Sequence, residues 1–130
     1  MNLQTAVKTV LSKYATFTGR ASRSEFWWFT LFIFLLSLVL AMIEGAILAP
    51  MSGLEAFAPE AGQPLRIPMS LALFLPSLAV TVRRLHDTDR SGWWYLIVLV
   101  PIIGILVLLY WYIQPGTEGP NDFGQVPLEK

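Results

Sequence analysis

Charged and apolar positions are separated into long blocks along the chain. Three stretches contain no charged residue, residues 26–43, 67–82 and 93–113, and they are 18, 16 and 21 residues long. A helix rises about 1.5 Å per residue, so about 20 apolar residues cross the roughly 30 Å hydrocarbon core of a bilayer. The pattern therefore predicts an all-α integral membrane protein with three transmembrane helices, over residues 26–49, 65–82 and 93–113.

The middle block is the shortest of the three. It reaches only about 24 Å as a helix, so the predicted span begins at Leu65 and lets the Arg66 side chain extend to the headgroups. If all three blocks cross, seven of the nine Lys and Arg residues fall on one side, and only Arg66 and Lys130 fall on the other. The positive-inside rule then predicts a cytoplasmic N-terminus and a periplasmic C-terminus.

The first 15 residues carry their own amphipathic pattern. Apolar residues recur with the period of a helix, and Lys8 and Lys13 lie on the opposite side. Such a helix lies in the membrane interface or packs against the protein's own spans, and periodicity does not distinguish the two positions. The predicted fold is a single membrane domain with an interfacial helix over residues 1–15 and a polar tail over residues 114–130.

Aromatic and small side chains indicate where the helices meet lipid and one another. Tryptophans anchor helices at the headgroup level of a membrane. The predicted interface anchors are Trp27, Trp28, Trp93, Trp94 and Trp111. Ala41, Gly45 and Ala49 recur every four residues, and such a stripe lets helices approach closely. We therefore expect a homo-oligomer or a larger membrane complex, with membrane lipids as the immediate partners.

Composition narrows the chemistry that the chain can carry. It has 14% charged residues, a formal net charge of zero, one histidine and no cysteine. These values exclude an ordinary soluble domain, a nucleic-acid binder with a basic surplus, a disulfide framework and a cysteine-bound metal. One histidine with scattered carboxylates is a poor ligand set, so we expect no metal and no cofactor.

Two motifs point to a family. One is Phe17-Thr-Gly-Arg-Ala-Ser-Arg-Ser-Glu-Phe-Trp-Trp28, and the other is Val82-Arg-Arg-Leu-His-Asp-Thr-Asp-Arg-Ser-Gly-Trp-Trp94. With the Pro-Gly and Asn-Asp-Phe-Gly sequences of the tail, they resemble the bacterial inner-membrane family called domain of unknown function 805, the YhaH-like proteins. The resemblance implies a multi-pass protein of the bacterial inner (plasma) membrane and supplies no activity. Asp89 and Asp122 depart from the small and the basic residue that are usual in the family.

The segment after the middle block concentrates the candidate chemistry. Residues 83–94 hold three arginines, the only histidine and two aspartates. Arginines and helix-terminal amides bind phosphate, which favours a site for an anionic lipid headgroup or another phosphate group. The candidate residues are Arg20, Arg23, Arg83, Arg84, His86, Arg90 and Ser91. The alternative is that the arginines only fix topology, as cytoplasmic positive charge beside a rigid turn.

Acidic residues near these arginines are expected to pair with them. The predicted pairing residues are Glu25, Asp87 and Asp89. On a helix Asp87 lies one turn from Arg83 and Arg84, which brings the side chains within reach. Glu44 lies close to the far end of the first span, where a solvated carboxylate is the preferred interpretation and an intramembrane functional residue is the alternative.

Three classes of function follow from these features. The first is a non-enzymatic membrane protein that binds anionic lipid or a membrane partner through a cytoplasmic Arg-rich face. The alternative is a small transport or channel component, with bends at Pro76, Pro101 and Gly104 near the midplane. The third is an enzyme that acts on a membrane substrate through His86 and Asp87. Adjacent helical residues do not face each other, so we expect no enzyme.

Overall fold

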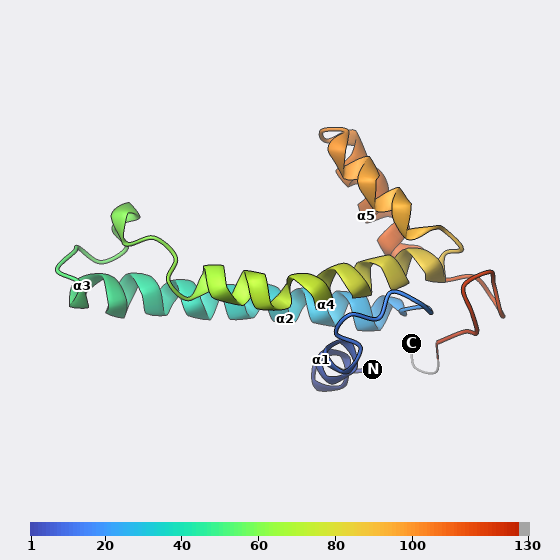
Figure 1. Cartoon of the computed structure of the whole chain (residues 1–130), viewed down its shortest axis with the longest axis horizontal. Helices are drawn as coiled ribbons and strands as arrows, with labels where there is room; N and C mark the ends of the chain where they lie inside the picture. The colour runs from blue at the N-terminus through green and yellow to red at the C-terminus, as the bar shows by residue number, and fades with distance from the viewer. Residues whose placement is uncertain (128–130) are drawn as a thin grey trace. The chain divides into compact units, whose positions relative to one another are not determined.

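The computed structural model describes residues 1–127, and helices form its regular elements (Figure 1). Within residues 1–127 the β pairing is limited to an isolated bridge between Asn121 and Gly124. The predicted all-α class is therefore confirmed. Lys130, which entered the count of basic residues, lies outside the described residues.

Two long helices correspond to the first two predicted spans. α2 (Arg23–Ile43) runs directly into the π-helix η1 (Glu44–Leu48) and then α3 (Ala49–Met51), which gives 29 residues in all. α4 (Arg66–Asp87) has 22 residues. At 1.5 Å per residue these helices extend about 44 Å and about 33 Å, so both are long enough to cross a membrane. Both are also apolar enough to do so.

The third predicted span is not a continuous helix. A 3₁₀ helix, η3 (Gly92–Leu99), is followed by a break and then by α5 (Ile103–Ile113). At the break Ile102 has φ 64° and ψ −62°, and the Ile103 amide donates to the Pro101 carbonyl at 2.6 Å. These are the features of a classic γ-turn, which reverses the chain within three residues. The prediction of one continuous helix over residues 93–113 is therefore wrong, and a membrane crossing by this block is not confirmed.

Two residue types explain why this block folds back. Pro101 restricts the preceding Val100, which has extended backbone at φ −84° and ψ 110° and cannot continue a helix. Gly104 is buried, and a side chain there would collide with the Ile97 carbonyl oxygen. Without a Cβ, α5 packs directly against η3. The bend expected at Pro101 and Gly104 is thus a full reversal, and we call residues 92–113 the hairpin.

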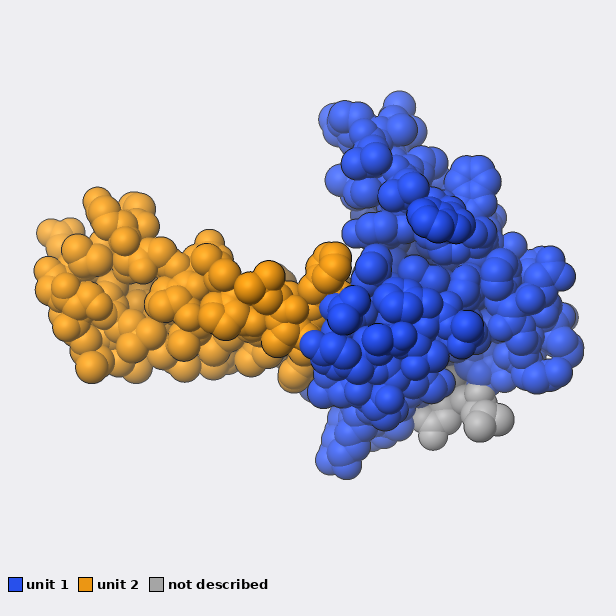
Figure 2. All heavy atoms as spheres, viewed as in Figure 1, with its two compact units in different colours: residues 1–29, 75–130 blue, residues 30–74 orange. Residues whose placement is uncertain are grey.

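The chain divides into two compact units (Figure 2). Unit 1 contains residues 1–29 and the chain from residue 75 onward, and unit 2 contains residues 30–74. Unit 1 therefore includes α1 (Leu3–Ser12), the start of α2, the end of α4 and the hairpin. Unit 2 includes η1, α3, the short 3₁₀ helix η2 (Pro59–Ala61) and the start of α4. Unit 1 contains a cluster of buried ion pairs, whereas unit 2 contains the ion pair between Glu44 and Arg66.

In α1, the side chain of Asn2 caps the helix by accepting a hydrogen bond from the Thr5 amide at 2.8 Å. Ala6 and Val10, on the apolar side, are fully buried inside unit 1. The helix predicted over residues 1–15 is thus present over ten residues, and part of its apolar face packs against the protein itself. Its contact with the membrane interface stays a prediction.

In unit 2, the small-residue stripe is covered by the chain's own loop. The Phe57 ring lies against Gly45, and the Phe57 amide donates to the Gly45 carbonyl at 2.9 Å. Ala49 is also buried. Gly45 and Ala49 therefore form an internal contact, so they do not offer a surface for another helix.

Candidate functional site

A cluster of buried charges surrounds the C-terminal end of α4 in unit 1. Its members are Arg20 from the connector between α1 and α2 (residues 13–22), Glu25 from the first turn of α2, and Arg83, Arg84 and Asp87 from α4. Each residue is at most 6% exposed. We call these five residues the clasp, because their bonds join the end of α4 to four other segments: the connector, the start of α2, the end of the hairpin and the tail.

Asp87 lies at the centre of the clasp. Its Oδ1 accepts from Arg20 Nε at 2.9 Å, and its Oδ2 accepts from Arg84. The backbone of Gly116 lies so close to this carboxylate that a Cβ there would overlap it. The Thr117 amide also donates to the Asp87 carbonyl at 2.7 Å. One aspartate thus ties the connector and the tail to the end of α4.

A second ion pair joins α2 to α4. Arg83 donates to the Glu25 carboxylate, and its Nε donates to the Thr16 carbonyl at 3.2 Å. The Ala21 amide donates in turn to the Arg83 carbonyl at 2.9 Å. The connector before α2 is therefore bound to α4 by both side-chain and backbone groups.

The clasp also holds the far end of the hairpin. Arg84 Nε donates to the Tyr112 carbonyl at 3.1 Å, and the indole of Trp27 donates to the same oxygen at 3.2 Å. At the near end of the hairpin, the Val82 side chain packs against the Gly92 backbone. Both ends of the hairpin consequently lie beside the C-terminal end of α4.

The tail returns to the connector as well. Arg20 donates to the carbonyls of Thr117 at 2.6 Å and Gly119 at 2.7 Å. The connector and the tail are therefore joined by hydrogen bonds inside unit 1. The predicted placement of the two termini on opposite sides of the membrane stays a prediction.

Electrostatics explains why these arginines stay in place. Three guanidinium groups share two carboxylates, and backbone carbonyls accept most of the remaining N–H groups. Buried charges are costly when they are unpaired, so the carboxylates and carbonyls must stay in position. Arg20, Arg83 and Arg84, which were predicted to bind phosphate, are therefore engaged inside the protein.

Two other candidate arginines lie at the hairpin base, which we define as Arg23, Arg90, Trp94 and Trp111. Arg23 is exposed and donates to the Ile113 carbonyl at 3.3 Å. The Arg90 guanidinium lies 4.5 Å from the centre of the Trp111 ring, and Trp111 meets Trp94 edge to face at 5.7 Å. Cations and tryptophans therefore gather where the hairpin leaves the rest of unit 1.

The remaining candidates, His86 and Ser91, line an apolar groove. His86 Nδ1 lies 2.9 Å from the Gly19 carbonyl, and its ring stacks on Phe123 with centroids 4.1 Å apart. The neighbouring Asp87 carboxylate binds Arg20 and Arg84. The structure does not bring His86 and this carboxylate together as a proton relay. Within residues 1–127, no group of three acidic, histidine or cysteine side chains could hold a metal.

Of the three predicted pairing residues, the structure brings Glu25 and Asp87 to arginines. Asp89 has no ion pair within the described residues, and its Oδ1 accepts a hydrogen bond from the Asp122 amide at 3.3 Å. Asp89 has φ 60°, in the left-handed region that Asp tolerates better than most residues. This conformation explains why a glycine suits the same position.

Several residues that build the site have no strong signal in the sequence. Tyr112, Thr117 and Gly119 act through their carbonyls, which every residue type carries. Gly116 and Phe123 act through close packing. Gly116 in the Pro-Gly motif of the tail was the one sequence signal, because a glycine lets the backbone approach another group, here the Asp87 carboxylate.

Glu44, in unit 2, is buried and paired. Its Oε2 accepts from the Leu65 amide at 2.7 Å and the Arg66 amide at 3.0 Å, and its Oε1 accepts from Arg66 Nε. A carboxylate in this position caps the start of α4 and complements the helix dipole. The interpretation of Glu44 as a solvated end was wrong, because the chain supplies internal partners for it.

Comparison with known proteins agrees with the motifs. The family model described as "Protein of unknown function (DUF805)" matches residues 14–125. The inner membrane protein YhaI of Escherichia coli K12 is 43% identical over 119 residues, which cover 92% of each chain. The inner membrane protein YhaH of the same strain is 40% identical over 118 residues, 91% of this chain and 92% of YhaH.

A more distant relative is the uncharacterized protein YiiR of the same strain. It is 35% identical over 103 residues, 78% of this chain and 60% of YiiR. No solved structure matches the chain. The extent of the family match and the two full-length relatives show that this chain belongs to the DUF805 family, whose members YhaI and YhaH are inner membrane proteins.

Proposed function

We propose that this protein is a non-enzymatic inner-membrane protein that binds anionic lipids of the cytoplasmic leaflet around a re-entrant hairpin. One observation carries the proposal: both ends of the hairpin are fixed to the same end of α4. Arg84 binds the Tyr112 carbonyl at one end, and Val82 packs on Gly92 at the other. The hairpin therefore enters and leaves the bilayer on one side.

The length of the hairpin fits one leaflet. Eight residues of 3₁₀ helix extend about 16 Å, and eleven residues of α-helix extend about the same distance. That is roughly half of a 30 Å hydrocarbon core. At the tip, Leu99, Ile102 and Ile103 are apolar and 77%, 72% and 64% exposed. Acyl chains are the surroundings that suit such side chains.

The distribution of basic residues supports the cytoplasmic leaflet. With two crossings, every Lys and Arg except Arg66 falls on the side of the N-terminal segment and the tail. This asymmetry is larger than the asymmetry that three crossings give. The positive-inside rule places such a side in the cytoplasm. We therefore propose that both termini are cytoplasmic.

The hairpin base is the part of this surface suited to anionic headgroups. Arg90 lies just before the start of the hairpin and Arg23 binds its last residue, Ile113, and both lie among tryptophans that prefer the interface. The enzyme alternative needs the Asp87 carboxylate to act with His86, but this carboxylate accepts hydrogen bonds from Arg20 and Arg84 instead. No observation favours the transport alternative over lipid binding.

The test measures lipid selectivity in reconstituted bilayers by electron paramagnetic resonance of spin-labelled lipids. The Arg23→Gln/Arg90→Gln double variant is compared with Lys8→Gln/Lys13→Gln, which removes the same charge from α1 and its end. We expect the preference for phosphatidylglycerol over phosphatidylcholine to fall up to about thirtyfold in the arginine variant, since two cations at headgroup level contribute about 2 kcal/mol together. Unchanged selectivity in that variant, or an equal loss in the lysine control, would contradict the proposal.

A further inference from the structure

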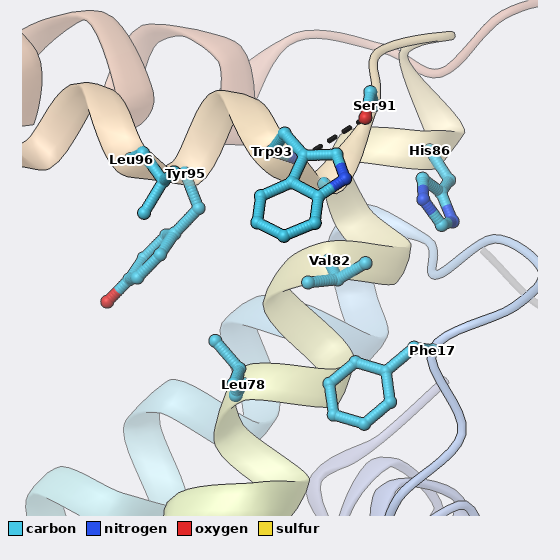
Figure 3. Close-up of a pocket in the computed structure, with 9 residues that line it drawn as sticks. Phe17, Leu78, Val82, His86, Ser91, Trp93, Tyr95 and Leu96 are labelled. Atoms are coloured by element: carbon cyan, nitrogen blue, oxygen red, sulfur yellow. Dashed lines mark hydrogen bonds between the residues drawn. The ribbon is translucent and has the colours of Figure 1, made fainter.

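An apolar groove runs between α4 and the hairpin in unit 1 (Figure 3). Its volume is about 410 Å³, within the range of sites that hold small-molecule ligands. Leu78 and Val82 of α4 form one wall, and Trp93 and Leu96 of η3 form the other. Phe17 of the connector lies at the α4 side, as the close-up shows.

The two ends of the groove differ in polarity. His86 and Ser91 lie at the end next to the start of η3, whereas Leu78, Leu96 and the ring of Tyr95, which carries one hydroxyl, lie further along the walls. Ser91 Oγ accepts a hydrogen bond from the Trp93 amide at 3.3 Å, and its own hydroxyl hydrogen can still donate. Among residues 1–127, no Asp, Glu, Lys or Arg lines the groove. It therefore suits a neutral, elongated apolar group with an acceptor at one end.

We propose that the groove binds one acyl chain of a membrane phospholipid, with the ester carbonyl near Ser91 and the chain along Leu78 and Leu96. This inference rests on the proposed re-entrant hairpin, because η3 forms one wall. It adds a defined site to the general contact with lipid at the hairpin base.

The surroundings of the groove argue for this occupant. One wall belongs to α4, which is a candidate membrane span, and the other belongs to the hairpin, whose outer surface is apolar. The polar end lies next to the hairpin base, where Arg90 and Trp111 mark the headgroup level. A phospholipid chain entering from the leaflet has its ester group at this level and its methylenes deeper. Acyl chains in a bilayer are already in an apolar phase, so the groove favours a chain through close van der Waals packing along both walls.

The test is native mass spectrometry of the full-length protein, extracted from bacterial membranes in mild detergent. The Leu78→Trp variant fills the groove. Leu71→Trp is the matched control, because Leu71 is on the same helix, is 74% exposed and does not line the groove. We expect one phospholipid to remain bound to the wild type and to Leu71→Trp, and the bound fraction to fall about tenfold in Leu78→Trp, which corresponds to about 1.4 kcal/mol.

A second variant protects the test against misfolding. Leu96→Trp fills the groove from the hairpin side, so the two filling variants should lose the lipid together. The thermal unfolding midpoint of each variant shows whether it folds, and the side of the tail, measured by cysteine labelling, shows whether the hairpin persists. A folded variant with an intact hairpin and undiminished lipid would overturn the acyl-chain site alone. A wild type without a retained lipid, or with a retained isoprenoid quinone, would overturn it as well.

Discussion

The two ends of α4 hold their charges in different ways. At the C-terminal end, in unit 1, Asp87 and both of its arginine partners are almost completely buried. At the N-terminal end, in unit 2, Glu44 is buried but the side chain of its partner Arg66 is 33% exposed. We call the second arrangement the cap, because Glu44 accepts from the first amides of α4.

The difference shows what each arrangement can tolerate. In the clasp, no partner can turn to water when another is removed, so a lost charge leaves a buried ion without compensation. In the cap, Arg66 can turn toward solvent, and the Glu44 bonds to backbone amides stabilise one helix end only. The clasp therefore holds the connector, α2, the hairpin and the tail against α4, whereas the cap stabilises only the N-terminal end of α4.

The largest effect is expected from Asp87→Asn. The substitution keeps the shape of the side chain and removes its charge, so Arg20 and Arg84 stay buried beside a neutral group. Breaking a buried ion pair in this way costs about 3–5 kcal/mol. We expect a strongly lowered thermal unfolding midpoint in mild detergent and faster proteolysis of the tail. Asp89→Asn is the control, and equal midpoints for the two variants would show that charge does not hold the clasp together.

The second largest effect is expected from an alanine substitution at Gly104 in unit 1, which we compare with the same substitution at Gly45 in unit 2. At Gly104 an added Cβ meets the backbone carbonyl of Ile97, which cannot move without opening the hairpin. At Gly45 it meets the Phe57 ring, a side chain that can rotate away. Overpacking of a tight contact costs about 1–3 kcal/mol. Gly104→Ala should therefore lower the unfolding midpoint more than Gly45→Ala, and the reverse order would count against direct packing of η3 on α5.

Glu44→Gln should have a smaller effect than Asp87→Asn. The amide keeps one oxygen to accept from the Leu65 and Arg66 amides, and Arg66 can find water. We expect faster hydrogen exchange at these two amides, with the clasp end of α4 unchanged. If exchange also increased at residues 83–87, the cap and the clasp would not be independent.

The smallest effect is expected from Arg66→Gln. Partly exposed ion pairs contribute about 0–1 kcal/mol, and the backbone bonds to Glu44 remain. The unfolding midpoint should shift by little, and less than for Glu44→Gln. If Arg66→Gln lowered the unfolding midpoint as much as Asp87→Asn does, breaking the ion pair of the cap would cost as much stability as breaking the clasp.

The sequence predicted the long helices well, because their signal is local. The length of the uncharged blocks alone located α2 and α4, and the middle block, although only 16 residues long, lies within a helix of 22 residues. The hairpin was missed because its composition is that of a span. Hydropathy does not register that the backbone of Gly104 packs on Ile97, a contact between two parts of the same apolar block.

The orientation prediction and the site both depend on backbone features that residue types do not reveal. The count of basic residues depends on the number of crossings, so the reversal within residues 92–113 changes the side that this count assigns to the tail. The arginine-rich segment was found from its side chains, but its partners include the carbonyls of Tyr112 and Thr117. A backbone acceptor has no residue-type signature, so the sequence could not show that these arginines are occupied.

The most direct measurement is the side of the membrane on which the tail lies. The chain has no cysteine, so single-cysteine variants can be labelled without background. Glu118→Cys in the tail is compared with Lys13→Cys beside α1 and Glu55→Cys in the loop before α4, using a membrane-impermeant maleimide on intact cells and inverted vesicles. We expect Glu118→Cys to label with Lys13→Cys, in inverted vesicles, and opposite to Glu55→Cys. Labelling of Glu118→Cys together with Glu55→Cys would mean that residues 93–113 cross the membrane, and it would contradict the re-entrant hairpin.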